Sequence, residues 1–119
     1  MLDIFLICPV RGVTNSENKL ISKYVHYLEA NGKEVYWPYR DTDQDDPIGN
    51  RICADNVLAM RQSKEVHVWY TASSTGTLFD LGAAFAMQKP IVIANRDSIE
   101  PTEGKSFSNV LLWWAGVLQ

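Results

Sequence analysis

The chain has 119 residues, of which 46% are hydrophobic and 21% charged, with a formal net charge of −3. We expect one domain spanning residues 1–119, of soluble globular composition, with no nucleic-acid-coating surface because Lys and Arg do not cluster. No apolar run reaches the length of a membrane span, and the first residues lack a targeting pattern. Cys8 and Cys53 lie far apart in apolar stretches, so we expect reduced thiols in a cytoplasmic protein.

The first part of the chain predicts a strand, a helix and a second strand. Residues 4–8 form a short apolar run, typical of a central strand buried on both faces of a parallel sheet. Residues 14–17 have the pattern of a capping box, and apolar residues at helical spacing continue to an Asn-Gly pair at 31–32. Residues 34–37 then predict the second strand.

The middle of the chain predicts a polar loop at 39–46 and a second helix. Asp46 and Pro47 are the residue types of an N-cap and a first helical position. One row of this helix, at i, i+4 spacing, consists of Ile48, Ile52, Asn56 and Met60. Asn56 is its polar member, so we expect it to face inward and to need a hydrogen-bond partner. The loop aspartates do not fit a calcium loop, and we expect no metal site.

The last part of the chain predicts two more strands, at 66–70 and 91–94, and two more helices. The helix that ends at residue 87 is rich in Gly and Ala, which permits close approach to the sheet. The helix at 106–118 is unusually apolar and predicts a subunit interface. Because strand and helix alternate throughout, we predict a three-layer α/β fold, doubly wound and flavodoxin- or Rossmann-like, with a mostly parallel sheet of four strands or, as the alternative, five.

In doubly wound folds ligands bind outside the carboxyl ends of the strands, near the switch point of strand order. This rule selects four loops, at 9–13, 38–46, 71–76 and after Asn95. Arg11, the acidic loop and the Ser73/Ser74/Asp80 group would then share one rim. Their convergence predicts a ligand site there.

Asp80 is the only charged residue from Leu78 to Met87, and a desolvated carboxylate without partners is costly. A helix start favours its ionised form, which could attack an electron-poor carbon; the alternative is a charge that stabilises the helix. The polar stretch 73–76 suits a phosphate or a sugar hydroxyl, or is ordinary capping. Arg11 could place a cationic guanidinium fork beside the stretch 73–76. The alternative is that Arg11 is a lone surface residue.

The residues that carry a resemblance to a known family are the segment 79–82 (Phe-Asp-Leu-Gly), Ser74, Gly76, the segment 39–42 (Tyr-Arg-Asp-Thr) and Asn109. In these residues the chain resembles the nucleoside 2-deoxyribosyltransferase family, including the related nucleoside 5′-monophosphate N-hydrolases. The resemblance implies cleavage of an N-glycosidic bond through a covalent glycosyl-enzyme, with transfer of the sugar to another base or to water. It implies no cofactor, and a homo-oligomer in which a neighbouring subunit lends an Asn. The family's fifth strand is expected to be missing or replaced here.

The resemblance assigns the nucleophile to Asp80, where the better-known members have Glu. The acid that protonates the leaving base falls on Asn56, which could hydrogen-bond the base, with Asp55 beside it as a substitute if the helix register slips by one. Ser74 and Arg11 resemble the phosphate site of the hydrolases. Asn109 resembles instead the Asn in the sugar site of the transferases. These signals are mixed and together lean toward a substrate with a 5′-phosphate. The expected substrate-binding residues are Cys8, Pro9, Val10, Arg11, Gly12, Tyr39, Asp41, Ser74, Gly76 and Asn109.

Two other functions are compatible with these residues. One is a non-catalytic nucleotide-binding or signalling domain on the same fold, which Asp in place of Glu at position 80 and Asn at position 56 favour. The other is an assembly subunit that binds a partner through its Trp113-Trp114 end.

Overall fold

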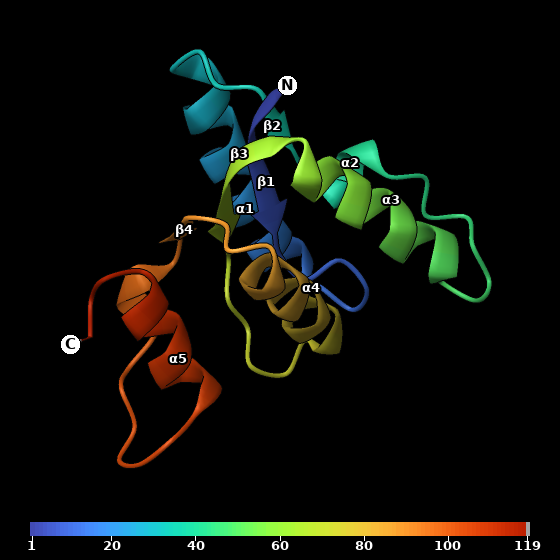
Figure 1. Ribbon diagram of the computed structural model, residues 1–119. Coiled ribbons are helices and arrows are strands. Elements are labelled where there is room, and N and C mark those ends of the chain that lie inside the picture. The colour runs from blue at the N-terminus through green and yellow to red at the C-terminus, as the bar shows by residue number, and fades with distance from the viewer. Residues whose placement is uncertain (119) are drawn as a thin grey trace.

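Four parallel strands form a sheet in the order β2-β1-β3-β4 in a computed structural model of the protein, which describes residues 1–118 (Figure 1). They are β1 (Leu2–Ile7), β2 (Val35–Tyr36), β3 (Ser63–Val68) and β4 (Ile91–Ile93). β1 pairs with β2 on one side and with β3 on the other, where Ile7 lies opposite Val68. The predicted four-stranded, doubly wound sheet is confirmed.

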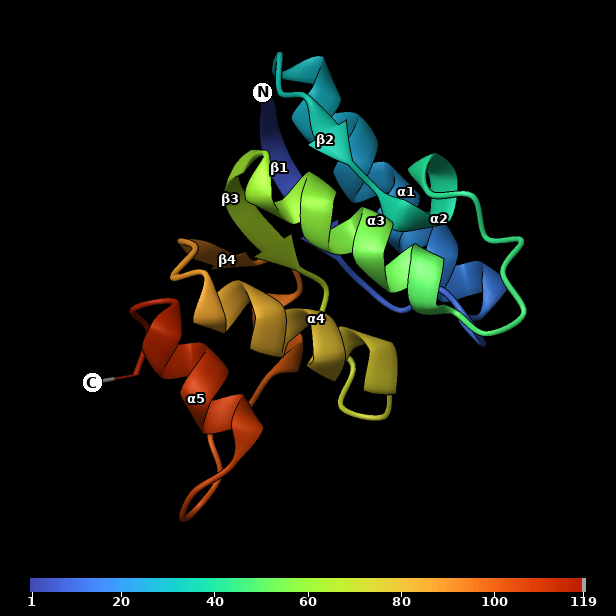
Figure 2. The same cartoon turned by 45° about the vertical axis from the view of Figure 1, so that its right-hand side comes forward.

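The helices cover the sheet unequally, with one on one face and three on the other (Figures 1 and 2). The four helices that cover the sheet are α1 (Asn15–Ala30), α3 (Asn50–Arg61), α4 (Thr75–Ala86) and α5 (Phe107–Trp114). The short helix α2 (Pro38–Asp41) follows β2, and a 3₁₀ turn η1 (Arg96–Ser98) follows β4. α1 lies alone on one face, whereas α3, α4 and α5 pack on the other. Within residues 1–118 no helix combines the length and the apolar character needed to cross a membrane.

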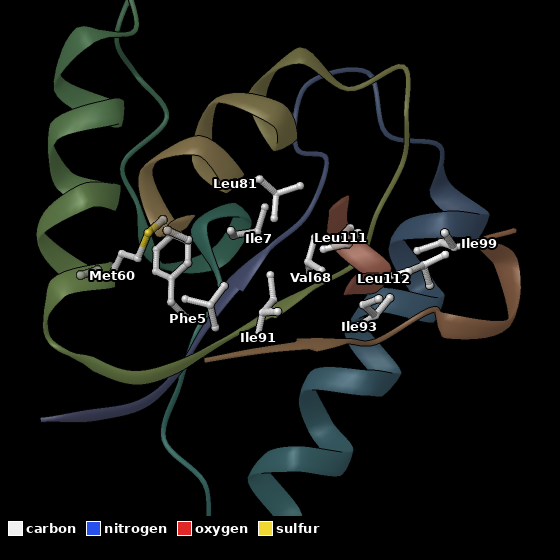
Figure 3. Packing of buried hydrophobic residues seen from close by; sticks show 13 residues of the cluster. Phe5, Ile7, Met60, Val68, Leu81, Ile91, Ile93, Ile99, Leu111 and Leu112 are labelled. Atoms are coloured by element: carbon white, nitrogen blue, oxygen red, sulfur yellow. The ribbon is translucent and has the colours of Figure 1, made fainter. Parts of the chain in front are cut away.

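The core forms on both sides of β1, because successive side chains of a strand point to opposite faces. Ile4 and Leu6 pack under α1, and Phe5 and Ile7 pack under the three other helices. All four side chains are at most 1% exposed. Figure 3 shows the larger layer, in which strand residues meet Met60, Leu81, Leu111 and Leu112 from α3, α4 and α5.

The ends of α1 follow the sequence signals. Thr14 is the N-cap, and its hydroxyl accepts a hydrogen bond from the backbone N–H of Glu17 at 3.2 Å. Beyond Asn31, Gly32 takes a left-handed conformation with φ of +83°, which glycine adopts without steric cost.

Two helix boundaries differ from the prediction. α3 begins at Asn50 and not at Pro47, because the carboxylate of Asp46 reaches forward to the N–H groups of Arg51 and Ile52 at 2.9 and 3.2 Å. Asp46 therefore satisfies amides of the first turn without being adjacent to it. α5 ends at Trp114 instead of residue 118, since a left-handed Gly116 turns the chain away. The expected polar loop at 39–46 also contains most of the short helix α2.

Candidate active site

A cleft of about 930 Å³ opens at the carboxyl ends of β1 and β3, the two strands between which the chain order reverses. The loop after β1 lines it with Cys8, Val10 and Arg11. Ser73 and the start of α4 line it with Thr75, Gly76, Phe79 and Asp80. The wall opposite comes from α2, the loop after it and α3, including Pro38, Tyr39, Gln44, Asp46, Pro47, Ile48, Gly49, Asn50, Ile52, Cys53 and Asn56.

Two carboxylates of the described residues line this cleft, those of Asp46 and Asp80, and Asp80 is the one without a partner. It accepts no hydrogen bond and forms no ion pair within residues 1–118. Burial raises its pKa to about 6, well above the usual value for Asp. The expected help from the helix start does not prevent this, because Asp80 is the sixth residue of α4 and the dipole acts mainly over the first turn. Near neutral pH the group is ionised, desolvated and free to react.

Cys8 is buried and lines the cleft as a neutral group. Burial raises the pKa of its thiol to about 12, and the negative charge of Asp80 adds to the shift. The thiol therefore stays protonated near neutral pH and is a poor nucleophile. Cys53, on the opposite wall, is the second free thiol that lines the cleft.

Asn56 faces inward, as the helical row predicts, and it has the partner that its burial requires. Its Oδ1 accepts a hydrogen bond from the Thr42 hydroxyl at 2.8 Å, and the residue is 7% exposed. Asp55 points away from the cleft and pairs with Arg51 at 2.7 Å. The helix register therefore presents Asn56 to the cleft and not Asp55.

The end of the cleft near α4 offers groups suited to an anion. Arg11 is exposed and has no ion-pair partner within the described part of the chain. The amides of Thr75 and Gly76 lie at the helix start, where backbone N–H groups have no intrahelical acceptor. Ser74 is the N-cap, and its hydroxyl accepts from the N–H of Thr77 at 3.2 Å. Ser73, not Ser74, lines the cleft.

Tyr39 lines the opposite wall and is supported from behind by a second aromatic residue. Tyr39 is 47% exposed and stacks on the buried Trp37, with 5.1 Å between ring centroids. The carboxylate of Asp41 accepts from the Trp37 N–H at 2.9 Å and pairs with Arg40, which also reaches Glu29 at 3.1 Å. Asp41 thus orients the aromatic pair and does not itself line the cleft.

Three further residues expected to bind substrate lie outside the cleft lining. Pro9 is buried, and Gly12 turns the loop with φ of +78°. Asn109 uses its whole amide group locally: Oδ1 accepts from the Thr102 N–H at 2.9 Å, and Nδ2 donates to the carbonyls of Thr102 and Gly104. Asn109 therefore closes the loop before α5.

The wall formed by Ile48, Ile52 and Cys53 was not predicted to line the site. The predicted row runs from Met60 in the core to Ile48, which is 85% exposed at the cleft edge. The helical row continues from the buried Asn56 to Ile52 and Ile48, toward the loop before α3. This continuation is the sequence signal from which the wall could have been predicted. Phe79 was also missed, although a large apolar residue beside the only charge of α4 marks the same place; it is 59% exposed.

The fold and the site define a doubly wound α/β domain with a cleft at its switch point and, within residues 1–118, an unpaired carboxylate inside it. The model of the nucleoside 2-deoxyribosyltransferase family matches residues 4–111, and the chain belongs to this family. No curated protein matches the chain. Among solved structures it is similar to a 2-deoxyribosyltransferase from the psychrotolerant bacterium Bacillus psychrosaccharolyticus, with 18% identity and a TM-score of 0.63 over 76% of this chain and 70% of that chain. That identity shows a shared fold.

Proposed function

We propose that the protein is an N-glycosidic-bond enzyme that acts on a (2′-deoxy)nucleoside or its 5′-monophosphate. Asp80 attacks the anomeric carbon, the bond from that carbon to the base nitrogen breaks, and a glycosyl ester forms. A second base or water then displaces the carboxylate. The observation that carries the proposal is the desolvated Asp80, which has no hydrogen-bond or ion-pair partner within residues 1–118 and faces a cleft large enough for a nucleoside.

The shorter reach of Asp compared with Glu is offset by the helix surface beside it. Gly76 lies one turn before Asp80 and lines the cleft, and a Cβ added at Gly76 would meet no atom within 4 Å. A sugar can therefore approach α4 closely at this point, which brings the anomeric carbon nearer to the Asp80 carboxylate.

The anion-binding end of the cleft supports a 5′-phosphate on the substrate. Arg11 would pair with the phosphate, while the Ser73 hydroxyl and the amides at the start of α4 would donate to its oxygens. Ser74 would act indirectly, by capping the helix that presents these amides.

A second copy of the chain is part of the proposal. One side of α5 exposes Phe107, Val110 and Trp113, which are 70%, 43% and 61% exposed, and no charged residue occurs in this helix. Such a surface favours association. Asn109 would shape this interface by holding its loop. A Trp113→Glu variant should sediment as a smaller species than the wild type, and equal sedimentation of the two would contradict the proposal.

A non-catalytic nucleotide-binding domain is the second candidate. It is favoured because, among residues 1–118, no free carboxylic acid lines the cleft with Asp80: Asp55 is paired with Arg51, and the carboxylate of Asp46 is engaged by helix amides. Thermal stabilisation by nucleotides without any release of base would favour this function over catalysis.

The test of the enzymatic function is release of free base from deoxynucleosides and deoxynucleoside monophosphates, with and without an added acceptor base. Asp80→Ala should abolish release, and Asp97→Asn, an exposed residue outside the cleft, serves as the matched control. Mass spectrometry of quenched reactions should detect the sugar bound to the wild type and not to Asp80→Ala. Absence of release from every substrate, or full activity of Asp80→Ala, would refute the proposal.

A further inference from the structure

We propose that Thr42 and Tyr36 are positioning residues that hold the Asn56 amide with Nδ2 open to the cleft. The leaving base is then activated by a hydrogen bond from a neutral amide and not by a proton from an acid. This inference rests on the proposed function and specifies how that site handles the base.

The three side chains form a continuous chain of hydrogen bonds. The Tyr36 hydroxyl lies 2.7 Å from Oγ1 of Thr42. The Thr42 hydroxyl in turn donates to Oδ1 of Asn56 at 2.8 Å. Thr42 and Asn56 are 5% and 7% exposed. Bonds between buried polar groups strengthen one another and fix the orientation of the groups that they join.

The direction of the chain follows from counting protons. A Thr hydroxyl has one proton, and Thr42 gives it to Asn56, so the contact between the two hydroxyls at 2.7 Å is a hydrogen bond only if Tyr36 donates. The Asp41 carbonyl, the other acceptor near the Tyr36 hydroxyl, lies farther away at 3.4 Å. The hydrogen bond from Thr42 occupies Oδ1 of Asn56. Nδ2 of Asn56 has no hydrogen-bond partner among residues 1–118, yet it is not one of the fully buried unpaired atoms, so it opens onto the cleft that the residue lines.

The other end of the chain is anchored in the core. The Tyr36 ring stacks on Phe5, with 5.6 Å between centroids and 11° between planes. The Thr42 backbone is held on both sides: its N–H donates to the Pro38 carbonyl at 3.0 Å, and its carbonyl accepts from Gln44. The stacked ring fixes the position of the Tyr36 oxygen and the two backbone bonds fix the Thr42 backbone, so the side chains that orient the Asn56 amide are themselves held in place.

An amide donor has a chemical consequence that an acid does not. When the glycosidic bond breaks, its electron pair passes to the base nitrogen, and Nδ2 stabilises the growing negative charge at an acceptor on the base while keeping its own proton. The base takes its proton from water afterwards. The substrate must therefore carry an unprotonated acceptor on the base, such as a carbonyl oxygen or ring nitrogen, and the rate must depend steeply on the acidity of the base.

The experiment compares Thr42→Val with Thr42→Ser on deoxyuridine and its 5-fluoro and 5-nitro derivatives, or on their 5′-monophosphates. Thr42→Val removes the hydroxyl at nearly constant volume and should lower kcat about tenfold for the uracil substrate. The loss should shrink as the base becomes more acidic, and Thr42→Ser should restore the rate. A loss of the same size for all three bases, or no difference between Val and Ser, would overturn the proposal.

Two further measurements keep the test decisive. Asn56→Asp should introduce a fall of kcat toward alkaline pH that the wild type lacks, because only Asp can act as an acid. Tyr36→Phe keeps the stacked ring and replaces Thr42→Val if that variant does not fold. If the wild type releases no base at all, the proposed function fails. Binding of uracil then tests the orientation of the Asn56 amide separately. The dissociation constant for uracil should be about tenfold higher in Thr42→Val than in Thr42→Ser.

Discussion

Arg51 and Asp55 lie one turn apart on α3, with 2.7 Å between guanidinium Nη1 and carboxylate Oδ2. The same guanidinium donates to the backbone carbonyls of Asp43 and Asp45. This pairing ties the acidic loop to the helix and keeps Asp55 out of the cleft. Asn56 is then the buried polar side chain that α3 presents to the cleft that Asp80 also lines.

Removing Asp55 should therefore leave activity nearly intact. We expect Asp55→Ala to change kcat less than twofold and to lower the free energy of unfolding by less than about 1 kcal/mol, as is usual for a surface ion pair. Asn56→Ala should lower kcat about 100-fold, the loss typical of a donor to developing charge. Base-release kinetics and urea unfolding measure both; comparable losses of activity in the two variants would show that the helix register is different in solution.

The raised pKa of Asp80 predicts the acid limb of the activity profile. Only the ionised carboxylate is a nucleophile, so kcat/KM should fall as the pH drops through about 6. The substrate should be an unphosphorylated nucleoside, because a phosphate titrates in the same range. A profile that stays flat down to about pH 4, near the ordinary value for Asp, would contradict a buried reactive carboxylate.

The same pKa predicts a stability cost at neutral pH. The folded state binds a proton at Asp80 more tightly than the unfolded state, whose pKa is near 3.8, so stability is lost as the pH rises through about 6. Asp80→Asn should raise the free energy of unfolding by about 1 to 3 kcal/mol at about pH 7.5, and the gain should disappear below about pH 4. Urea unfolding at both pH values measures it, with Asp97→Asn as the control. A variant less stable than the wild type at neutral pH would exclude this account.

Two glycines of α4 provide a matched pair for the approach of the sugar. Neither Gly76 nor Gly82 has a positive φ, and a Cβ would meet no atom within 4 Å at either position, so Ala should fold well at both. Only Gly76 lines the cleft. Gly76→Ala should raise KM about tenfold or more because a methyl group excludes the sugar from α4. Gly82→Ala should have wild-type kinetics, and equal effects would rule out close approach at Gly76.

The exposed Arg11 should discriminate between phosphorylated and unphosphorylated substrates. Arg11→Ala should raise KM for a monophosphate about 10- to 100-fold, the value of a charge-assisted hydrogen bond, and leave KM for the nucleoside nearly unchanged. Arg61→Ala, at the far end of α3 and outside the cleft, controls for net charge. Equal changes for both substrates would argue against a 5′-phosphate.

Local signals predicted those elements in which short-range and tertiary preferences agree. Most of the apolar run at 4–8 lies in β1 (Leu2–Ile7), because a strand buried on both faces needs no polar side. Thr14 caps α1 because its partner lies three residues away. The predicted start of α3 at Pro47 was wrong because the Asp46 carboxylate accepts from amides five and six residues ahead, those of Arg51 and Ile52. Capping rules consider only residues next to the helix start.

The sequence alone predicted the doubly wound α/β domain and the inward orientation of Asn56, because the alternation of strands and helices and the helical periodicity carry this information. It also predicted that Arg11, Ser73 and Asp80 share one rim, and these three residues line the same cleft. Tertiary structure alone decided which neighbours each group has. Desolvation raises the pKa of Asp80 despite its place near a helix start. An ion pair with Arg51 holds Asp55 outside the cleft, and the Asn109 amide bonds to the loop before α5. These outcomes depend on burial and on contacts between distant residues, and no local pattern in the chain encodes them.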